Sequence, residues 1–575
     1  MDKKLIGADH DYEINCRAIL EGTRKLVGWG ASAFLHYHLI KCPYPLAYLI
    51  DNDPDKWGTQ YCGIEIRSPS NLECEPPDSV LIISFIPLDL ICKQIEAIGP
   101  FAITIPFQIE KDGPLLRRLL ISRPLQEWPT WTQTLMKTVK EGARRERRMA
   151  LRSAYRAALS RGATQAVRRR ASLMFFCLHP GGADRQICNL AVGLREHGWD
   201  VELVSYAAPM PGTEHYVRLL EEAGVSFRIL PNPRETGQMQ IDERDHNEQF
   251  NLVIQFVRHL PPEIMFYVLA AYHYFVRQRP ELIVSYLDYQ NIIASLGGLL
   301  AGVPNILLSG RNLHPGNFPH YYSTGTEWIR HYYRLVLRFP NVTMSSNSAA
   351  GAISYAEWLR VAPDSVRVIN NGILFDRKRM VAAGDVERAR TELGAQADTP
   401  LVVGVFRLAI EKNPQTFVDV VAQAKRKFPN LKAAIVGEGP MRESTERYIA
   451  DLGLQGTIKL TGVRDNVAPY MLAGDVILHV AEAEGIPNAL LEAQMLGRPI
   501  VCTLGGGTSE SLASSLMTYA REVGDVEGLT RALCDLLGDR KQALSVGHSA
   551  FVETSTRFSI EALVTNTLAA RGLES

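Results

Sequence analysis

The chain has 575 residues, 46% of them hydrophobic and 22% charged, and its formal net charge is zero. Domains hold roughly 100 to 200 residues, so this length exceeds what one hydrophobic core supports and indicates three or four units. The composition is that of an ordinary globular protein, and the balanced charge argues against a nucleic acid or another polyanion as a general partner.

Cysteine usage and the N-terminus indicate the compartment. The nine cysteines are scattered and include no Cys-x-x-Cys pair, which predicts buried thiols in a reducing compartment and neither a zinc site nor a disulfide framework. The start of the chain lacks the apolar core of a signal peptide, and no stretch approaches about 18 uncharged apolar residues. We therefore expect a cytoplasmic protein.

The first predicted module, residues 1–125, carries a nucleotide-type fingerprint. An apolar strand leads into Gly28 and Gly30, and a second apolar strand ends in Asp51, about 20 residues later. The module resembles the small Rossmann-like modules of bacterial polysaccharide-biosynthesis proteins, and no catalytic Tyr-x-x-x-Lys follows. We expect a binding or docking module. A nucleotide site at these three residues and a purely structural strand–turn–helix both remain open.

The composition changes in the predicted linker, residues 126–170. Between residues 131 and 170, apolar side chains are interleaved with twelve basic residues, and only two residues are acidic. The basic residues are Lys137, Lys140, Arg144, Arg145, Arg147, Arg148, Arg152, Arg156, Arg161, Arg168, Arg169 and Arg170. This pattern predicts a basic amphipathic helix, which can lie on an anionic membrane surface. A solvated linker helix between domains explains the same pattern, so both interpretations remain open.

Further strand-to-helix turns follow the linker. An apolar strand precedes Gly181, Gly182 and Ala183, and the two glycines let a ligand approach the backbone where helix-start N–H groups can face an anion. A later apolar strand leads into Arg311 and His314. A histidine in a loop is more often a surface residue than a functional one, and that alternative applies to His314.

The most informative stretch holds two glutamates eight positions apart, Glu484 and Glu492, between two apolar strands. Residues 488–496 contain no Gly or Pro and repeat apolar side chains at helical spacing. Glu484 is therefore expected in the loop at a strand's carboxyl end, and Glu492 on the following helix, where open α/β sheets bind ligands. Arg407 and Lys412 follow another buried strand, and their cationic groups suit a diphosphate.

The Glu-x7-Glu stretch, with its Gly-x-Pro and the following Ala-x-x-x-Gly-x-Pro, resembles the donor-sugar signature of retaining glycosyltransferases of family 4. The resemblance implies an α/β GT-B fold: an acceptor-side Rossmann-like domain at residues 171–375 facing a donor-binding domain at 376–575. It implies catalytic roles for Arg407, Lys412 and Glu484. The implied donor-binding residues are Glu492, Gly437, Glu438, Gly439, Val463, Arg464, Gly485, Asn488 and Ala489.

The resemblance also implies a reaction: transfer of a sugar, with retention, from a nucleotide-diphosphate sugar to a saccharide or lipid-linked acceptor in surface polysaccharide biosynthesis. On the acceptor side it implies Gly181, Gly182, Ala183, and either Arg311 or His314 where many family members carry a histidine. Because two cations can replace a metal at the diphosphate, we expect neither metal nor cofactor. The alternative is a non-catalytic nucleotide-sugar-binding or scaffold protein of a polysaccharide-assembly complex.

Overall fold

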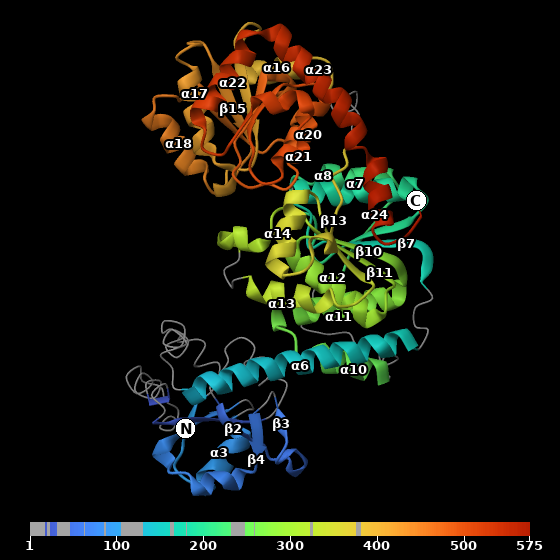
Figure 1. The fold of residues 1–575 in the computed structure, drawn as a ribbon, viewed down its shortest axis with the longest axis vertical. Helices are drawn as coiled ribbons and strands as arrows, with labels where there is room; N and C mark the ends of the chain where they lie inside the picture. The colour runs from blue at the N-terminus through green and yellow to red at the C-terminus, as the bar shows by residue number, and fades with distance from the viewer. Residues whose placement is uncertain are drawn as a thin grey trace. The chain divides into compact units, whose positions relative to one another are not determined.

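The computed structural model divides into two compact units. Unit 1 comprises Met1–Ala163 and Pro233–Leu269, and unit 2 comprises Thr164–Asn232 and Ala270–Ser575. Within the described residues the strands form three sheets, visible as the three strand layers of Figure 1. The described residues are 18–19, 23–30, 46–61, 64–84, 88–104, 130–160, 166–179, 181–231, 248–257, 259–321, 326–374 and 381–574.

The sheet of unit 1 has the strand order β3-β4-β2-β1-β5-β6, and all its pairs are parallel except β3 with β4. Its parallel strands thus follow the 3-2-1-4-5 order of nucleotide-binding folds. Its buried core includes Val27, Trp29, Ile50 and Ile82. Its elements are β1 (Lys25–Trp29), β2 (Leu46–Ile50), β3 (Gln60–Tyr61), β4 (Ile64–Arg67), β5 (Val80–Ser84), α3 (Leu88–Ile98) and β6 (Ala102–Thr104).

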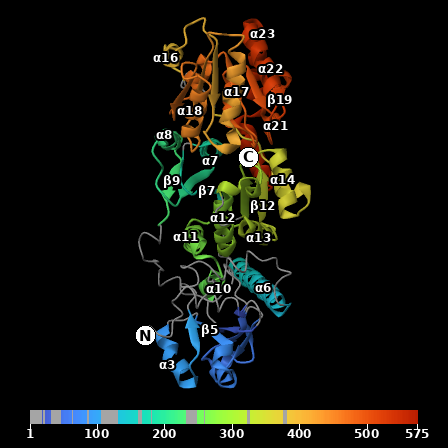
Figure 2. The same cartoon turned by 90° about the vertical axis from the view of Figure 1, so that its left-hand side faces the viewer.

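Two further helices of unit 1, α6 (Thr130–Ser160) and α10 (Glu248–Val257), pack side by side, as Figure 2 also shows. The predicted helical linker ran to residue 170, but α6 ends at Ser160 and strand β7 (Val167–Met174) has already begun. The reason is tertiary pairing, because the start of β7 joins β10 and Arg170 pairs with Asp200 at 2.8 Å. Among the described helices, none is both long and apolar enough to cross a membrane.

The first sheet of unit 2 is entirely parallel, in the order β13-β12-β11-β10-β7-β8-β9. The order in which the strands are added reverses between β7 and β10, and open α/β sheets bind ligands at the carboxyl ends of the strands at such a switch point. Its strands are β7, β8 (Asp200–Ser205), β9 (Ser226–Ile229), β10 (Pro280–Tyr286), β11 (Asn305–Gly310), β12 (Val342–Ser346) and β13 (Val366–Val368). Its helices are α7 (Gly182–Glu196), α8 (Glu214–Glu222), α12 (Asp288–Ala301), α13 (Glu327–Val336), α14 (Ala349–Leu359) and the second half of α11 (Pro262–Gln278), whose first residues are assigned to unit 1.

The second sheet of unit 2 repeats this plan in the order β16-β15-β14-β17-β18-β19, again with parallel pairs. Its switch point lies between β14 and β17. The strands are β14 (Leu401–Val405), β15 (Lys432–Val436), β16 (Ile458–Gly462), β17 (Val476–His479), β18 (Ile500–Thr503) and β19 (Ala520–Arg521). The helices are α16 (Asp385–Glu392), α17 (Pro414–Ala424), α18 (Arg442–Asp451), α19 (Ala468–Ala473), α20 (Asn488–Met495), α21 (Thr508–Ser511), α22 (Val526–Gly538), α23 (Arg540–Arg557) and α24 (Ile560–Ala569).

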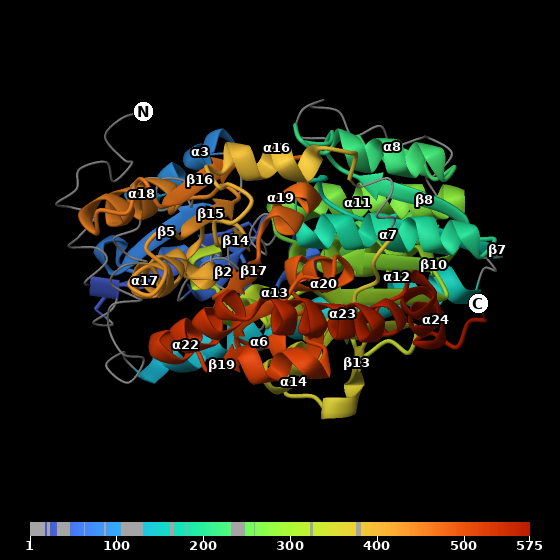
Figure 3. The same ribbon diagram turned by 90° about the horizontal axis from the view of Figure 1, so that it is seen from above.

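The last helix, α24, returns to the first sheet of unit 2 and packs against α7, and Figure 3 shows α23 leading into it. Leu563 and Val564 belong to the hydrophobic core of that first domain. A Cβ on Gly193 of α7 would lie 2.7 Å from a Val564 methyl group, so the absence of a side chain there permits the close packing. The predicted donor domain, 376–575, thus contributes its final helix to the other domain.

Candidate functional site

The centre of the candidate site is a buried carboxylate at the switch point of the second sheet. Glu484 follows β17 and is 7% exposed. Its Oε1 forms an ion pair with Lys412 Nζ and lies 3.2 Å from Nε2 of His479, the last residue of β17. Lys412 ends a short helical turn, Ile410–Lys412, after β14. The two strands that flank the switch point therefore bring the predicted pair together.

The surroundings of Glu484 fix its charge. Burial alone would raise the pKa of this carboxyl, but the Lys412 ammonium and the His479 contact outweigh burial and lower the pKa to about 2. Glu484 is therefore an ionised hydrogen-bond acceptor at neutral pH. Both contacts are to Oε1, so within the described part of the chain Oε2 is the oxygen that can accept a hydrogen bond from a hydroxyl group.

Glycines pack closely on two sides of the Glu484 loop, residues 480–487 between β17 and α20. Gly507 N donates to the Glu484 carbonyl at 2.8 Å, and a Cβ on Gly506, whose φ is +62°, would collide with that carbonyl. On the other side, a Cβ on Gly485 would lie 2.9 Å from the Arg311 carbonyl oxygen of the first domain. The backbone segments pack so closely that side chains at these positions are excluded.

Arg407, the second predicted cation, is exposed at the end of β14. Its guanidinium lies 5.7 Å from the ring centroid of Tyr321, which comes from the first domain. The Tyr321 hydroxyl donates to Glu411 at 2.7 Å, and burial together with that carboxylate raises the pKa of Tyr321 to about 12. Arg407 and Lys412 thus occupy the same strand-to-helix connection, one exposed and one partly buried.

Two neighbouring turns carry other predicted donor residues. The turn after β15 is bonded to both adjacent strand ends, because Gly437 N donates to Gly462 O at 3.0 Å and the Glu438 carbonyl accepts from Leu408 N at 3.1 Å. A Cβ on Gly439 would lie 2.8 Å from Leu408 N, so this close approach requires glycine. The Glu438 carboxylate pairs with Arg442 at 2.7 Å.

In the turn after β16, Val463 is 53% exposed, whereas Arg464 pairs with Glu392 of α16. The Arg464 guanidinium also lies 5.4 Å from the ring centroid of Tyr470. This turn therefore presents an apolar side chain at the carboxyl edge, and its cation is bound within the domain.

The first residue of α20, Asn488, connects the two domains of unit 2. Its Nδ2 donates to Gly182 O at 2.9 Å, and its Oδ1 accepts from Asn371 at 2.7 Å and Gln186 at 3.1 Å. Gln186 also bonds to both backbone groups of Gly372. The Asn488 amide, which was predicted to bind the donor, thus takes part in a set of hydrogen bonds between the two domains, here called the interdomain clasp. Its neighbour Ala489 is partly buried.

Glu492 lies one helical turn further along α20 and is 6% exposed. It forms an ion pair with Arg185 of α7, across the domain boundary. Gly182 and Ala183 are the first two residues of that helix, so the predicted acceptor-side turn directly faces the start of α20. The Arg185 pairing was not predicted, because a basic residue on a helix surface carries no signal of a partner 307 positions away in the sequence.

The two acceptor-side candidates at the end of β11 have different surroundings. Arg311 stacks on Tyr286 at 4.2 Å from the ring centroid and donates to Asn371 of the interdomain clasp. Burial lowers the pKa of its guanidinium. His314 instead stacks on Trp358 at 5.2 Å, and its Nδ1 accepts from Gly316 N at 3.0 Å. Arg311 therefore adjoins the site, and His314 shapes a local turn.

In the N-terminal module, the predicted nucleotide residues have structural contacts. Gly28 lies inside β1, paired with strands on both sides, and Gly30 follows it with φ +99°. The Asp51 carboxylate accepts from Asp53 N at 3.0 Å and from Lys56 at 3.2 Å. The helix predicted to follow Gly30 lies outside the described residues. A nucleotide site here stays a prediction.

Sequence reasoning missed one residue that touches the predicted catalytic glutamate. His479 looked like part of an apolar strand, and only the turn of the chain after β17 places its Nε2 against Glu484. A histidine that ends a buried strand at a sheet's carboxyl edge was the available signal. Among the described residues, no three His, Cys, Asp or Glu side chains cluster closely enough to hold a metal ion.

The chain is similar to several known proteins. Residues 385–551 match the family described as glycosyl transferases group 1. The Vi polysaccharide biosynthesis protein VipC/TviE of Salmonella typhi is 25% identical over 371 residues, which span 62% of this chain and 62% of that relative. The lipopolysaccharide core biosynthesis glycosyltransferase LpsE of Rhizobium meliloti is 23% identical over 349 residues, which span 60% of this chain and 91% of that relative.

Solved structures agree in fold. HepE of Anabaena, crystallised in complex with UDP and glucose, superposes with a TM-score of 0.54 and 20% identity, over 69% of this chain and 98% of HepE. The predicted GT-B fold is thereby confirmed, with an additional α/β module ahead of it. Residues 385–551 are therefore similar to glycosyl transferases group 1, and they lie within a GT-B arrangement of two Rossmann-like domains.

Proposed function

We propose that the protein is a retaining glycosyltransferase that moves a sugar from a nucleotide-diphosphate sugar to a saccharide or lipid-linked acceptor, in surface polysaccharide biosynthesis. The observation that carries this proposal is the cluster of the buried Glu484 and His479 with the partly buried Lys412, at the switch point of the sheet in the segment that matches the group 1 family. The names of the two polysaccharide and lipopolysaccharide relatives support the biosynthetic setting.

The donor's two ends meet different groups in this proposal. The ionised Glu484 offers Oε2 to a hydroxyl of the donor sugar, while Lys412 and His479 hold Oε1. An ammonium group has three N–H donors, so Lys412 can contact a phosphate oxygen while it remains paired with Glu484. Arg407 is exposed on the same connection and can contact the diphosphate too. Glu492 is proposed to accept hydrogen bonds from the ribose hydroxyls, and its ion pair with Arg185 would break when the donor binds.

The chemical step breaks the bond between the anomeric carbon and the phosphate oxygen and forms a bond from that carbon to the acceptor oxygen on the same face. Negative charge grows on the leaving diphosphate, where the two cations stabilise it. The acceptor's proton passes to a leaving phosphate oxygen. This route retains the anomeric configuration and uses the cations Arg407 and Lys412 in place of a metal ion.

The first donors to examine are uridine diphosphate sugars, because the similar HepE was crystallised with UDP, glucose and UDP-glucose. A lipid-linked acceptor would also explain the basic helix α6. Its described residues expose Arg144, Arg145, Arg152 and Arg156 together with Met149, which is 57% exposed. We include peripheral binding to an anionic membrane surface in the proposal on that ground.

A panel of nucleotide sugars tests the function. The full chain should bind one donor and slowly release its nucleotide by hydrolysis, and Glu484→Gln should reduce that release by about a hundredfold or more. Glu443→Gln, on the exposed face of α18, is the matched control and should leave the rate unchanged. Binding of a donor without any release or transfer would support the scaffold alternative instead.

A further inference from the structure

The turn that faces α20 carries a histidine that the predicted roles leave unused. His179 follows β7 at the switch point of the first sheet, two residues before Gly181, and its side chain is 57% exposed. Its Nδ1 lies 2.9 Å from the Cys177 carbonyl oxygen. A carbonyl only accepts hydrogen bonds, so Nδ1 carries the proton and, in the neutral ring, Nε2 is left with its lone pair.

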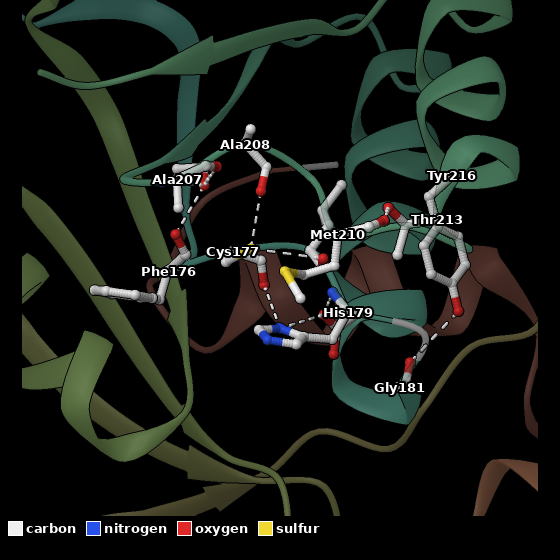
Figure 4. A network of polar contacts seen from close by, with 12 residues as sticks. Phe176, Cys177, His179, Gly181, Ala207, Ala208, Met210, Thr213 and Tyr216 are labelled. Carbon is white, nitrogen blue, oxygen red and sulfur yellow. Dashed lines mark hydrogen bonds and ion pairs between the residues drawn. The ribbon is translucent and has the colours of Figure 1, made fainter. Parts of the chain in front are cut away.

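The backbone around His179 is fixed by several hydrogen bonds, which Figure 4 shows. The His179 amide donates to the buried Asp184 carboxylate, and Gly181 N donates to the His179 carbonyl at 2.7 Å. Cys177 Sγ donates to Ala208 O at 3.0 Å, which joins the strand end to the next loop. The backbone that carries the imidazole is therefore held by hydrogen bonds, while the ring itself is exposed.

An apolar side chain lies beside this imidazole. Met210 is 46% exposed and its thioether points toward the His179 ring in Figure 4. Phe176, two residues after the end of β7, is 37% exposed and points away from the polar network. A pyranose presents hydroxyl groups at its rim and C–H groups on its faces. A lone-pair acceptor beside apolar surface matches that combination.

The location links this surface to the donor site. Gly182, three residues after His179, accepts through its carbonyl from Asn488 Nδ2 at 2.9 Å, at the start of the helix that carries Glu492. Arg185 of the same turn pairs with Glu492 directly. His179 thus belongs to the segment of the first domain that touches the Glu-x7-Glu helix, on the acceptor side.

We propose that His179 is an acceptor-binding residue, whose Nε2 accepts a hydrogen bond from a hydroxyl group that neighbours the attacking hydroxyl of a pyranose acceptor, while Met210 contacts the ring's C–H face. This inference rests on the proposed glycosyl transfer and specifies its acceptor as a saccharide end. This hydrogen bond orients the acceptor so that its attacking oxygen faces the anomeric carbon, and the proton of the attacking hydroxyl stays available to pass to the leaving phosphate oxygen.

Two variants separate this role from a structural one. His179→Asn can keep the bond to the Cys177 carbonyl, because its amide nitrogen lies near the Nδ1 position, but it lacks an acceptor at Nε2. His179→Gln places an amide oxygen within reach of the Nε2 position. With the full chain, a nucleotide sugar and a panel of methyl hexosides, His179→Asn should raise the acceptor KM about tenfold, and His179→Gln should restore part of that loss.

Donor hydrolysis without acceptor is the second readout, and neither variant should change it. An acceptor KM within twofold of wild type for His179→Asn, or an equal fall in hydrolysis and transfer, would overturn the role of His179. Wild-type hydrolysis of a donor without transfer to any hexoside would also overturn it, because the acceptor class would be wrong. Absence of both wild-type reactions would instead reject the proposed function itself.

Discussion

Glu484 is buried beside one cation and one imidazole, and those neighbours control its ionisation. A carboxylate with the proposed role of accepting hydrogen bonds from a neutral sugar has to stay charged after water leaves, and burial alone favours the protonated form. Lys412 reverses that preference. The same pairing means that the fold is more stable when Glu484 is ionised, so stability and site chemistry share one pH dependence.

The folded-state pKa of Glu484, about 2, lies below its ordinary value of 4.5. Its contribution to the free energy of unfolding is therefore complete above pH 4.5 and is lost as the pH falls toward 2. That contribution is roughly 3 kcal/mol at pH 7 and roughly half as large at pH 3. Urea unfolding of wild type and Glu484→Gln should show a stability difference at pH 7 that shrinks at pH 3.

The control for this measurement is Glu443→Gln, whose carboxylate is exposed on α18. It should match wild type within about 0.5 kcal/mol at both pH values. A Glu484→Gln difference that stays the same at pH 7 and pH 3 would mean that the Lys412 pair does not hold the charge of Glu484.

At the residue scale, sequence alone placed Glu484, Lys412 and Arg407 after the correct strands. It could not place Arg185 against Glu492 or Asn488 against Gly182, because those contacts depend on how two domains dock. Pattern and spacing describe local structure, whereas docking is decided by surfaces far apart in the chain. Interdomain partners were for that reason the part of the site that sequence could not predict.

Among the elements, the loop after β18 sets the position of the Glu484 loop. Gly506 has φ +62°, and a Cβ there would collide with the Glu484 carbonyl. Gly506→Ala should cost more than about 1 kcal/mol of stability and lower the transfer rate at least tenfold, because the glutamate's backbone must move. Thermal unfolding and steady-state kinetics measure the two effects.

Gly538→Ala is the matched control, since nothing lies within 4 Å of its Cβ position at the end of α22. It should be neutral or slightly stabilising, by up to about 1 kcal/mol. If Gly506→Ala behaved like this control, the close packing of the two loops would have no part in positioning Glu484.

The basic helix α6 offers a separate test at this scale. Arg147 is 4% exposed and is therefore left unchanged, although the sequence pattern alone made it a candidate. Replacement of the exposed arginines with glutamine should weaken binding to phosphatidylglycerol vesicles by about a hundredfold or more, since each contributes roughly 1 kcal/mol near an anionic surface. Vesicle co-sedimentation measures it. The arginines to replace are Arg144, Arg145, Arg152 and Arg156.

The matched control replaces exposed arginines of the donor domain: Arg388, Arg426, Arg447 and Arg531. It should sediment like wild type with anionic vesicles, and donor binding should be unchanged in the α6 variant. Equal sedimentation of wild type with neutral and anionic vesicles, or none with either, would leave α6 as a linker helix.

Strands were predictable because buried parallel strands appear as short apolar runs between turn residues. The run at 476–480, for example, became β17, Val476–His479. The start of strand β7 was not predictable from the sequence, because its pairing with β10 extends the strand over a basic stretch. Tertiary pairing overrode the local helical pattern there.

At the scale of unit 2, the two sheets share the strand order 3-2-1-4-5-6, which β13 extends in the first sheet, and residues near their two switch points contact each other. Lys412, Glu484 and His479 come from one domain, while Arg185, Gly182 and Arg311 come from the other and meet it through α20 and the Glu484 loop. The return of α24 to the first domain's core also ties the domains together. This arrangement supports transfer between a donor and an acceptor bound on opposite sides.

The most direct test of the central claim is the anomeric configuration of the product. The full chain should transfer the sugar of an α-linked nucleotide donor to a saccharide in the presence of EDTA, and proton NMR should show an α-linked product from the first turnovers. A β-linked product would contradict retention. Transfer that stops in EDTA and returns with magnesium or manganese would contradict the use of Arg407 and Lys412 in place of a metal.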